Sequence, residues 1–176
     1  LEVFAKVREA VKIPLAVKLH PYYTSMLHVA SAFDRLGADA VVLFNRLFQP
    51  DIDIKQEQER STLVLSTASD ALVPARWTAL LYDKIEADII ASTGIMSGED
   101  VIKMILAGAD AVQVVSTLYE NQVKHIGDML QEMTTWIDHK GYTELADFRG
   151  HVSEQRVADP RAWERGQYIK ALIGFD

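Results

Sequence analysis

The sequence predicts an α/β fold built from repeated strand–helix units. The stretch Glu86–Thr117 reads as an apolar strand, a tight loop, an amphipathic helix and a second apolar strand. The letters GADAV at Gly37–Val41 recur unchanged at Gly108–Val112, and EADII at Glu86–Ile90 is a looser third copy. In both identical copies a glycine that ends a helix precedes an apolar run. Such units join parallel strands through right-handed crossovers, which predicts a barrel or a doubly wound sheet.

The first half of the chain supplies two strands and two helices. Apolar residues at helical spacing open the chain, and Gly37 ends the second helix. After Pro50 the sequence has no strong periodicity. The predicted elements are a helix carrying Phe4, Val7, Ala10 and Val11, a strand at Ile13–Leu19, a helix at Thr24–Leu36, a strand at Ala38–Phe44 and a short extended piece at Leu63–Leu65.

The second half supplies the other two strands and most of the helical residues. Ser97 begins a capping pattern with Asp100, and Gly108 ends the helix that follows. The predicted elements are a helix from Pro74 to about Lys84, strands at Ala87–Ser92 and Asp110–Val115, a long helix at Tyr119–Lys140 ended by Gly141, and a last helix with Asp159 as N-cap and Pro160 in its first turn.

Four strand–helix units make half of a TIM (β/α)8 barrel, which needs eight units and about 250 residues. We therefore expect residues 1–176 to form one domain, a half-barrel with additional C-terminal helices. The chain begins at Leu1 without an initiator methionine, so we expect it to be part of a longer protein. The strand residues expected to point inward are Val17, Val41, Leu43, Ile90 and Val114.

A half-barrel of this kind would leave an apolar patch and two open sheet edges. We therefore expect either a homo-oligomer or association with an N-terminal half of the barrel.

Composition excludes several classes of protein. The chain has 176 residues, 49% of them hydrophobic, which is enough for one core. Its net charge of −7 and the lack of a Lys/Arg run argue against a nucleic-acid partner. The absence of cysteine excludes disulfides and thiolate metal sites, and the five histidines have no ligand spacing. No apolar run approaches the roughly 20 residues of a membrane span, so a cytoplasmic protein is expected.

The candidate binding residues follow the predicted strands. Thr93-Gly94-Ile95 and Ser116-Thr117 are loops whose small residues let backbone N–H groups approach a ligand, a pattern typical of phosphate sites in barrels. We expect a larger residue at Gly94 to block a phosphate without disturbing the strands. Lys18 ends an apolar strand and Asn45 follows the next one. Alternatively, Lys18 extends to solvent, Asn45 and Gly94 make turns, and Ser116-Thr117 caps a helix.

Four motifs resemble the carboxyl-terminal half of the dihydroorotate dehydrogenase family, from about residue 10 to residue 155. They stand in the family's order, each at a strand end. The motifs are IPLAVKLHP with Lys18, ADAVVLFNR with Asn45 followed by QPDID, ASTGI at 91–95, and ADAVQVVST ending at Thr117.

This resemblance implies a TIM barrel that binds FMN at its carboxyl-terminal face. Lys18 would contact the flavin ring, and Asn45 would line the ring and substrate pocket. Gly94 and Ile95 would offer N–H groups to the FMN phosphate, with Ser116 and Thr117 completing the cradle. The family often has two consecutive glycines where this chain has Thr93-Gly94. The family's catalytic base, a Cys or Ser on an earlier loop, has no counterpart, so no catalytic residue is predicted within this chain.

The predicted function is that of an FMN-dependent oxidoreductase that converts dihydroorotate to orotate in pyrimidine biosynthesis. Two alternatives remain. One is a non-catalytic half-barrel that only binds phosphate. The other is a flavin-free, phosphate-binding barrel isomerase or synthase, which would need a carboxylate at a strand end. The residues at these strand ends are instead a lysine, an asparagine and small residues.

Overall fold

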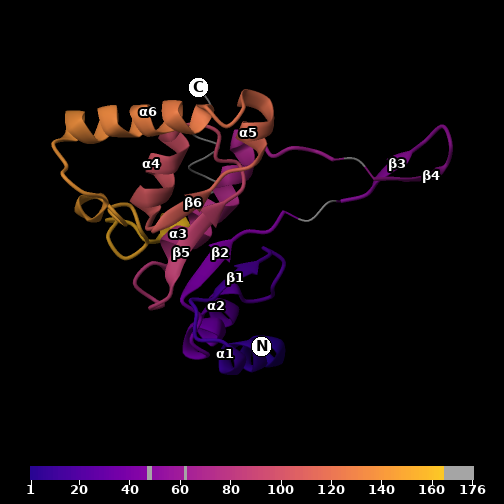
Figure 1. Cartoon of the computed structure of the whole chain (residues 1–176), viewed down its shortest axis with the longest axis horizontal. Coiled ribbons are helices and arrows are strands. Elements are labelled where there is room, and N and C mark those ends of the chain that lie inside the picture. Colours follow the sequence, from indigo (N-terminus) through magenta and orange to yellow (C-terminus); the bar gives the residue numbers. More distant parts are fainter. Residues whose placement is uncertain (47–48, 62, 165–176) are drawn as a thin grey trace.

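The computed structural model describes residues 1–46, 49–61 and 63–164. Its centre is a sheet of four parallel strands in the order β1-β2-β5-β6, which confirms the predicted α/β class. Helices alternate with these strands along the chain (Figure 1). The strands are β1 (Ala16–Leu19), β2 (Ala40–Leu43), β5 (Asp88–Ser92) and β6 (Ala111–Gln113), each shorter than the sequence predicts.

The helices begin and end close to the predicted signals. Ser97 caps one of them by accepting the Asp100 N–H, and Gly108 ends it with a positive φ of 124°. The helices are α1 (Glu2–Ala10), α2 (Met26–Arg35), α3 (Leu72–Leu81), α4 (Gly98–Ala107), α5 (Ser116–Asn121), α6 (His125–Lys140) and α7 (Arg161–Glu164), with short 3-10 turns at Ala68–Ala71 and Leu145–Asp147. The part of the predicted last helix beyond residue 164 lies outside the described residues.

The predicted helix at Tyr119–Lys140 is wrong in one respect: it is two helices. Gln122 ends α5 with a φ of 67°, and α6 begins three residues later. Apolar residues keep their helical spacing across the break, so periodicity gave no sign of it. Gly141 ends α6 in a left-handed conformation, as predicted.

A second, antiparallel sheet forms an arm that extends away from the body of the molecule (Figure 1). It consists of β3 (Asp51–Asp53) and β4 (Gln58–Arg60). The sequence did not predict this hairpin because its strands are three residues long and mostly polar. The predicted extended piece at Leu63–Leu65 is not a strand.

The helix-covered side of the sheet holds the core. Val41 and Leu43 of β2 are fully buried there, together with Leu19 and Ile89 of the neighbouring strands. The expectation that Val17, Val41 and Leu43 point into a barrel interior is therefore wrong, whereas Ile90 lies on the opposite face. Val17 packs against the same core and Val114 against a second cluster around α4 and α6. Strands that read as apolar on both faces do not reveal from sequence which face a residue takes.

The opposite side of the sheet carries a different row of residues. Side chains alternate between the two faces of a strand. Lys18, Val42 and Ile90 are aligned in the strand register, and Gln113 lies on the same face of β6. Lys18 and Gln113 are exposed, and Lys18 Nζ donates to Gln113 Oε1 at 3.1 Å. This bond joins the two outer strands of the sheet.

The aspartates of the GADAV repeat have the same role in both copies. Asp39 accepts the N–H of Leu15, just before β1, at 2.6 Å. Asp110 accepts the N–H of Ile89, at the start of β5, at 2.8 Å. Asp39 therefore fixes the start of β1, and Asp110 fixes the start of β5. In each case the strand is the one that precedes the GADAV copy in the chain. An arginine pairs with each of them, Arg8 with Asp39 and Arg149 with Asp110.

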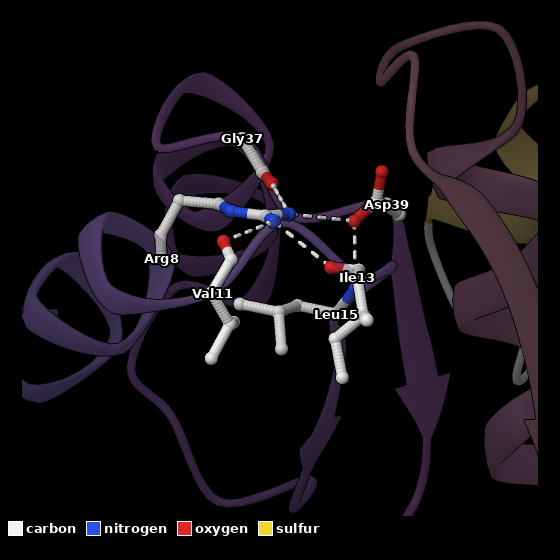
Figure 2. Close-up of polar contacts among 6 residues, drawn as sticks. All are labelled: Arg8, Val11, Ile13, Leu15, Gly37 and Asp39. Atoms are coloured by element: carbon white, nitrogen blue, oxygen red, sulfur yellow. Dashed lines mark hydrogen bonds and ion pairs between the residues drawn. The ribbon is translucent and has the colours of Figure 1, made fainter.

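Arg8 connects the first helix to this point (Figure 2). Its guanidinium donates to Asp39 Oδ2 at 2.8 Å and to the carbonyl oxygens of Val11 and Ile13 at 2.9 Å. The Leu15 N–H, together with Arg8, holds the pKa of Asp39 below its usual 3.8. The stabilisation from ionised Asp39 is therefore present above pH 3.8 and is lost as the pH falls through the lower folded-state pKa.

None of the described helices combines the length and apolar composition needed to span a lipid bilayer.

The Asp110→Ala substitution tests the importance of these strand-start contacts. It leaves the Ile89 N–H and Arg149 without their partner, so the free energy of unfolding should fall by about 1–3 kcal/mol. Asp88→Ala, at the exposed aspartate of the third repeat copy, is the matched control and should change stability by about 0.5 kcal/mol or less. Urea denaturation measures both. Equal losses in the two variants would contradict this role for Asp110.

Candidate functional site

The carboxyl ends of the four parallel strands surround one cavity of about 370 Å³. Segments far apart in the chain contribute to it, including the residues between the hairpin arm and α3. Six of the seven predicted cofactor-binding residues line this cavity: Lys18, Asn45, Thr93, Gly94, Ile95 and Ser116.

Lys18 supplies a positive charge to this cavity from β1, and Arg46 also lines the cavity. Its ammonium group is oriented by the hydrogen bond to Gln113, which also lines the cavity. The sequence analysis did not single out Gln113, because nothing local shows that residues 18 and 113 meet. The partner that Lys18 has among the described residues is a neutral amide, so its ammonium group can still pair with an anionic ligand.

The loop after β5 has a constrained backbone. Thr93 has a φ of 84° and Gly94 a φ of 73°, a region that a β-branched residue such as threonine rarely adopts. The Thr93 hydroxyl donates to the Phe44 carbonyl oxygen at 3.2 Å, which links the ends of β2 and β5. Unlike a glycine at this position, Thr93 therefore has a side chain that contacts the end of the neighbouring strand.

Gly94 is required by packing as well as by its backbone angle. A Cβ built there would lie 2.3 Å from the Ala71 nitrogen and 2.7 Å from the Thr67 carbonyl oxygen. The expectation that Gly94 could be enlarged without disturbing the fold is therefore wrong. The glycine lets the loop approach the turn before α3, and its N–H faces the Ser66 hydroxyl at 3.3 Å.

Ser66 joins the two predicted phosphate loops, and the sequence analysis missed it. Its hydroxyl lies 2.7 Å from the Ser116 hydroxyl, and its N–H donates to Ser116 Oγ at 2.9 Å. It also accepts the Gly94 N–H. The nearest sequence signal was the capping pattern from Thr67 to Asp70, which marks a helix start at this point. The three residues form a small polar group at one end of the cavity.

Thr117 differs from the other predicted residues. Its side chain is fully buried, and its hydroxyl donates to the Met96 carbonyl oxygen at 3.0 Å. The structure therefore does not bring this side chain into the cavity.

The N-terminus of α4 is occupied by groups of the chain itself. Asp100 accepts the Met96 N–H at 3.1 Å, and Glu132 of α6 accepts the Gly98 N–H at 2.7 Å. Carboxylates at a helix N-terminus take the place of an external anion there. An anion at this site would therefore bind to the loop before α4 and beside Ser116.

A second cavity of about 360 Å³ adjoins the first. Phe44, Asn45 and Thr93 line both cavities, and Tyr22 and Val73 line only the second. Asn45 is thus placed where a ligand could extend from one cavity to the other.

The described side chains form no group of three or more His, Asp or Glu residues that could hold a metal ion.

Comparison with known proteins places these residues in a family. A family model described as dihydroorotate dehydrogenase matches residues 1–137, which include all seven predicted binding residues. The chain belongs to the dihydroorotate dehydrogenase family. Dihydroorotate dehydrogenase A (fumarate) of Lactobacillus helveticus (strain DPC 4571) is 31% identical over 156 residues, which are 86% of this chain and 50% of that relative.

A second relative gives a similar match. The catalytic subunit of dihydroorotate dehydrogenase B (NAD(+)) of Methanosarcina mazei is 31% identical over 159 residues, 86% of this chain and 49% of that protein. The chain thus spans about half the length of the curated dihydroorotate dehydrogenases that it matches.

The crystal structure of the Eimeria tenella dihydroorotate dehydrogenase in complex with ferulenol superimposes with a TM-score of 0.63 at 24% identity. That match covers 77% of this chain and 37% of the Eimeria chain. The fold is therefore that of the TIM-barrel family, of which this chain contributes four consecutive parallel strands.

Gly94→Ala tests the close packing of the loop in this dihydroorotate dehydrogenase-family chain. We expect unfolding free energy to fall by about 2–4 kcal/mol, because the new Cβ meets backbone atoms in a left-handed conformation. The control is Gly127→Ala in α6, where no atom lies within 4 Å of the added Cβ. That variant should gain about 0.5–1 kcal/mol. Denaturant titration measures both, and a neutral Gly94→Ala would refute the packing argument.

Proposed function

We propose that this chain is one domain, the cofactor-binding half of an FMN-dependent dihydroorotate dehydrogenase that oxidises dihydroorotate to orotate. The observation that carries the proposal is the meeting of Lys18, Asn45 and the two small-residue loops in one cavity. Family membership supports it, and the curated relatives are named for this activity.

The cavity residues fit FMN by their chemistry. The Ser66 and Ser116 hydroxyls share one hydrogen bond, which leaves one O–H of the pair to donate to a phosphate. The Gly94 N–H, which donates to the Ser66 hydroxyl here, would become a further donor if a phosphate oxygen replaced that hydroxyl. Lys18, oriented by Gln113, would face the N1/O2 edge of the flavin ring and stabilise the negative charge that develops there on reduction. When bound, the flavin would supply the acceptor for a hydride from the substrate.

The base that removes the substrate proton would come from the part of the family fold that lies outside these 176 residues. The chain contains no cysteine, and it spans about half the length of the curated relatives. For the same reason the first partner we propose is the amino-terminal half of the barrel, which would cover the Lys18 face of the sheet. A homo-oligomer is the alternative partner.

The flavin-free isomerase or synthase is disfavoured by the cavity lining. Such an enzyme would need a carboxylate at a strand end as its acid or base. The described residues that line the 370 Å³ cavity include no Asp or Glu.

Titration with FMN and with riboflavin tests the proposed cofactor. Fluorescence quenching should report FMN binding at least about tenfold tighter than riboflavin binding, because only FMN carries the phosphate. A visible absorption spectrum of the protein purified without added cofactor is the companion measurement. Equal affinity for the two ligands would contradict the phosphate site. Binding without any reduction by dihydroorotate is expected of this chain alone.

Lys18→Ala tests the proposed contact with the flavin ring. In the complete protein it should slow flavin reduction by dihydroorotate about tenfold or more and lower the flavin potential, because a positive charge is lost where negative charge develops. Stopped-flow absorbance and potentiometry measure the two effects. Lys12→Ala, which removes an exposed lysine before β1, is the control and should change neither. Unchanged kinetics and potential in Lys18→Ala would remove Lys18 from the site.

A further inference from the structure

The loop between β5 and α4 is held from behind by two side chains of α6. His125 Nε2 lies 3.0 Å from the Met96 carbonyl oxygen. Glu132 accepts the Gly98 N–H at 2.7 Å. His125 and Glu132 are seven residues apart, which places them on the same face of α6, two turns from one another.

The contact between α4 and α6 is close. A Cβ at Gly98 would lie 2.4 Å from the Met129 carbonyl oxygen and 2.7 Å from the Glu132 Cβ. The start of α4 therefore rests directly on α6. A shift of α6 would be transmitted to the residues that precede α4, including the proposed phosphate loop.

Both nitrogens of the His125 ring face acceptors. Nε2 faces the Met96 carbonyl, and Nδ1 lies 3.3 Å from Asp128 Oδ2. A carbonyl oxygen and an ionised carboxylate can only accept hydrogen bonds, and a neutral imidazole has only one N–H. Only the doubly protonated imidazolium can donate to both groups at once.

The surrounding charges favour this cation. Asp128 and Glu132 flank it on α6, and Asp100 lies across on α4, where it is paired with Lys103 at 3.1 Å. The bond to the Met96 carbonyl is the largest cause that raises the pKa of His125 above 6.5, and Asp128 adds to it, while partial burial opposes it. The charge that strengthens both contacts is therefore fully present below pH 6.5 and is lost as the pH rises through the higher folded-state pKa. Above that pKa the one remaining N–H of the ring can donate to only one of the two acceptors.

The Met96 carbonyl oxygen connects the loop before α4 to two helices, α5 and α6. It accepts the Thr117 hydroxyl of α5 at 3.0 Å as well as the His125 ring of α6. These two donors turn the carbonyl toward the helices. A carbonyl oxygen turned toward the cavity would repel an anion, so its orientation affects how well the loop binds phosphate.

We propose that His125 is a positioning residue of the phosphate site: its imidazolium, supported by Asp128, holds the Met96 carbonyl away from the bound phosphate and makes phosphate affinity depend on pH. The inference rests on the proposed FMN site. His125 itself touches no ligand and acts through the loop.

The experiment measures FMN affinity by fluorescence quenching from pH 6.5 to pH 9 in the full chain. The affinity of the wild type for FMN should fall about fivefold over this range. This change corresponds to the lower end of the coupling free energies that are common between two linked sites. His125→Gln, whose amide can donate one hydrogen bond at every pH but cannot become charged, should show a nearly flat profile. His139→Gln, at the other end of α6, is the control and should follow the wild type.

A second measurement needs no substitution. Because linkage is reciprocal, saturating FMN should raise the pKa of His125, measured by NMR of its ring, and leave the ring signals of His139 unaffected. Parallel pH profiles for wild type and His125→Gln, or no change in the His125 titration on FMN binding, would overturn the role of His125 while the FMN site stands. Failure of the wild type to bind FMN at any pH would instead overturn the proposed function.

Discussion

Two aspartates fix where β1 and β5 begin, and the site depends on these contacts. Asp39 and Asp110 each accept the N–H at the start of a preceding strand and each pair with an arginine. In the resulting register Leu19, Leu43 and Ala91 are aligned at the carboxyl ends of β1, β2 and β5, and Ser92 is aligned with Gln113 at the end of β6. The residues after each strand therefore meet at one edge of the sheet, which is where the cavity lies. The aspartates of the sequence repeat thus support the site from the amino ends of the strands, opposite to the cavity.

The polar contacts at that edge connect residues that are distant in the chain. Lys18 meets Gln113, and Ser66 meets Ser116, so the first and last strands and the loop after the hairpin arm share one site. The α6 helix supports the same site from behind through His125 and Glu132. Charge is distributed accordingly. The cavity is lined by Lys18, Arg46 and hydroxyl groups, whereas the carboxylates of Asp100 and Glu132 lie behind the loop, at the N-terminus of α4.

Local signals predicted much of the fold. The Ser97 cap, the glycines at positions 37, 108 and 141, and the repeat are contained in a few residues each, and the structure confirms them. The break at Gln122 was missed because apolar spacing continues across it. The sheet face that Val41 and Leu43 occupy was predicted wrongly because β2 is apolar on both faces. Ser66, Gln113 and His125 act through partners 29 to 95 residues away, which no local pattern reveals.

The proposed function requires that the strand-end cavity bind FMN through the loops at Gly94 and Ser116. Backbone amide NMR during an FMN titration tests it most directly, because each N–H reports its own surroundings. We expect the largest shifts at Gly94, Ile95 and Ser116, and we expect inorganic phosphate to reproduce part of them. Shifts concentrated around Tyr22 and Val73 in the neighbouring cavity, or spread evenly over the chain, would contradict it.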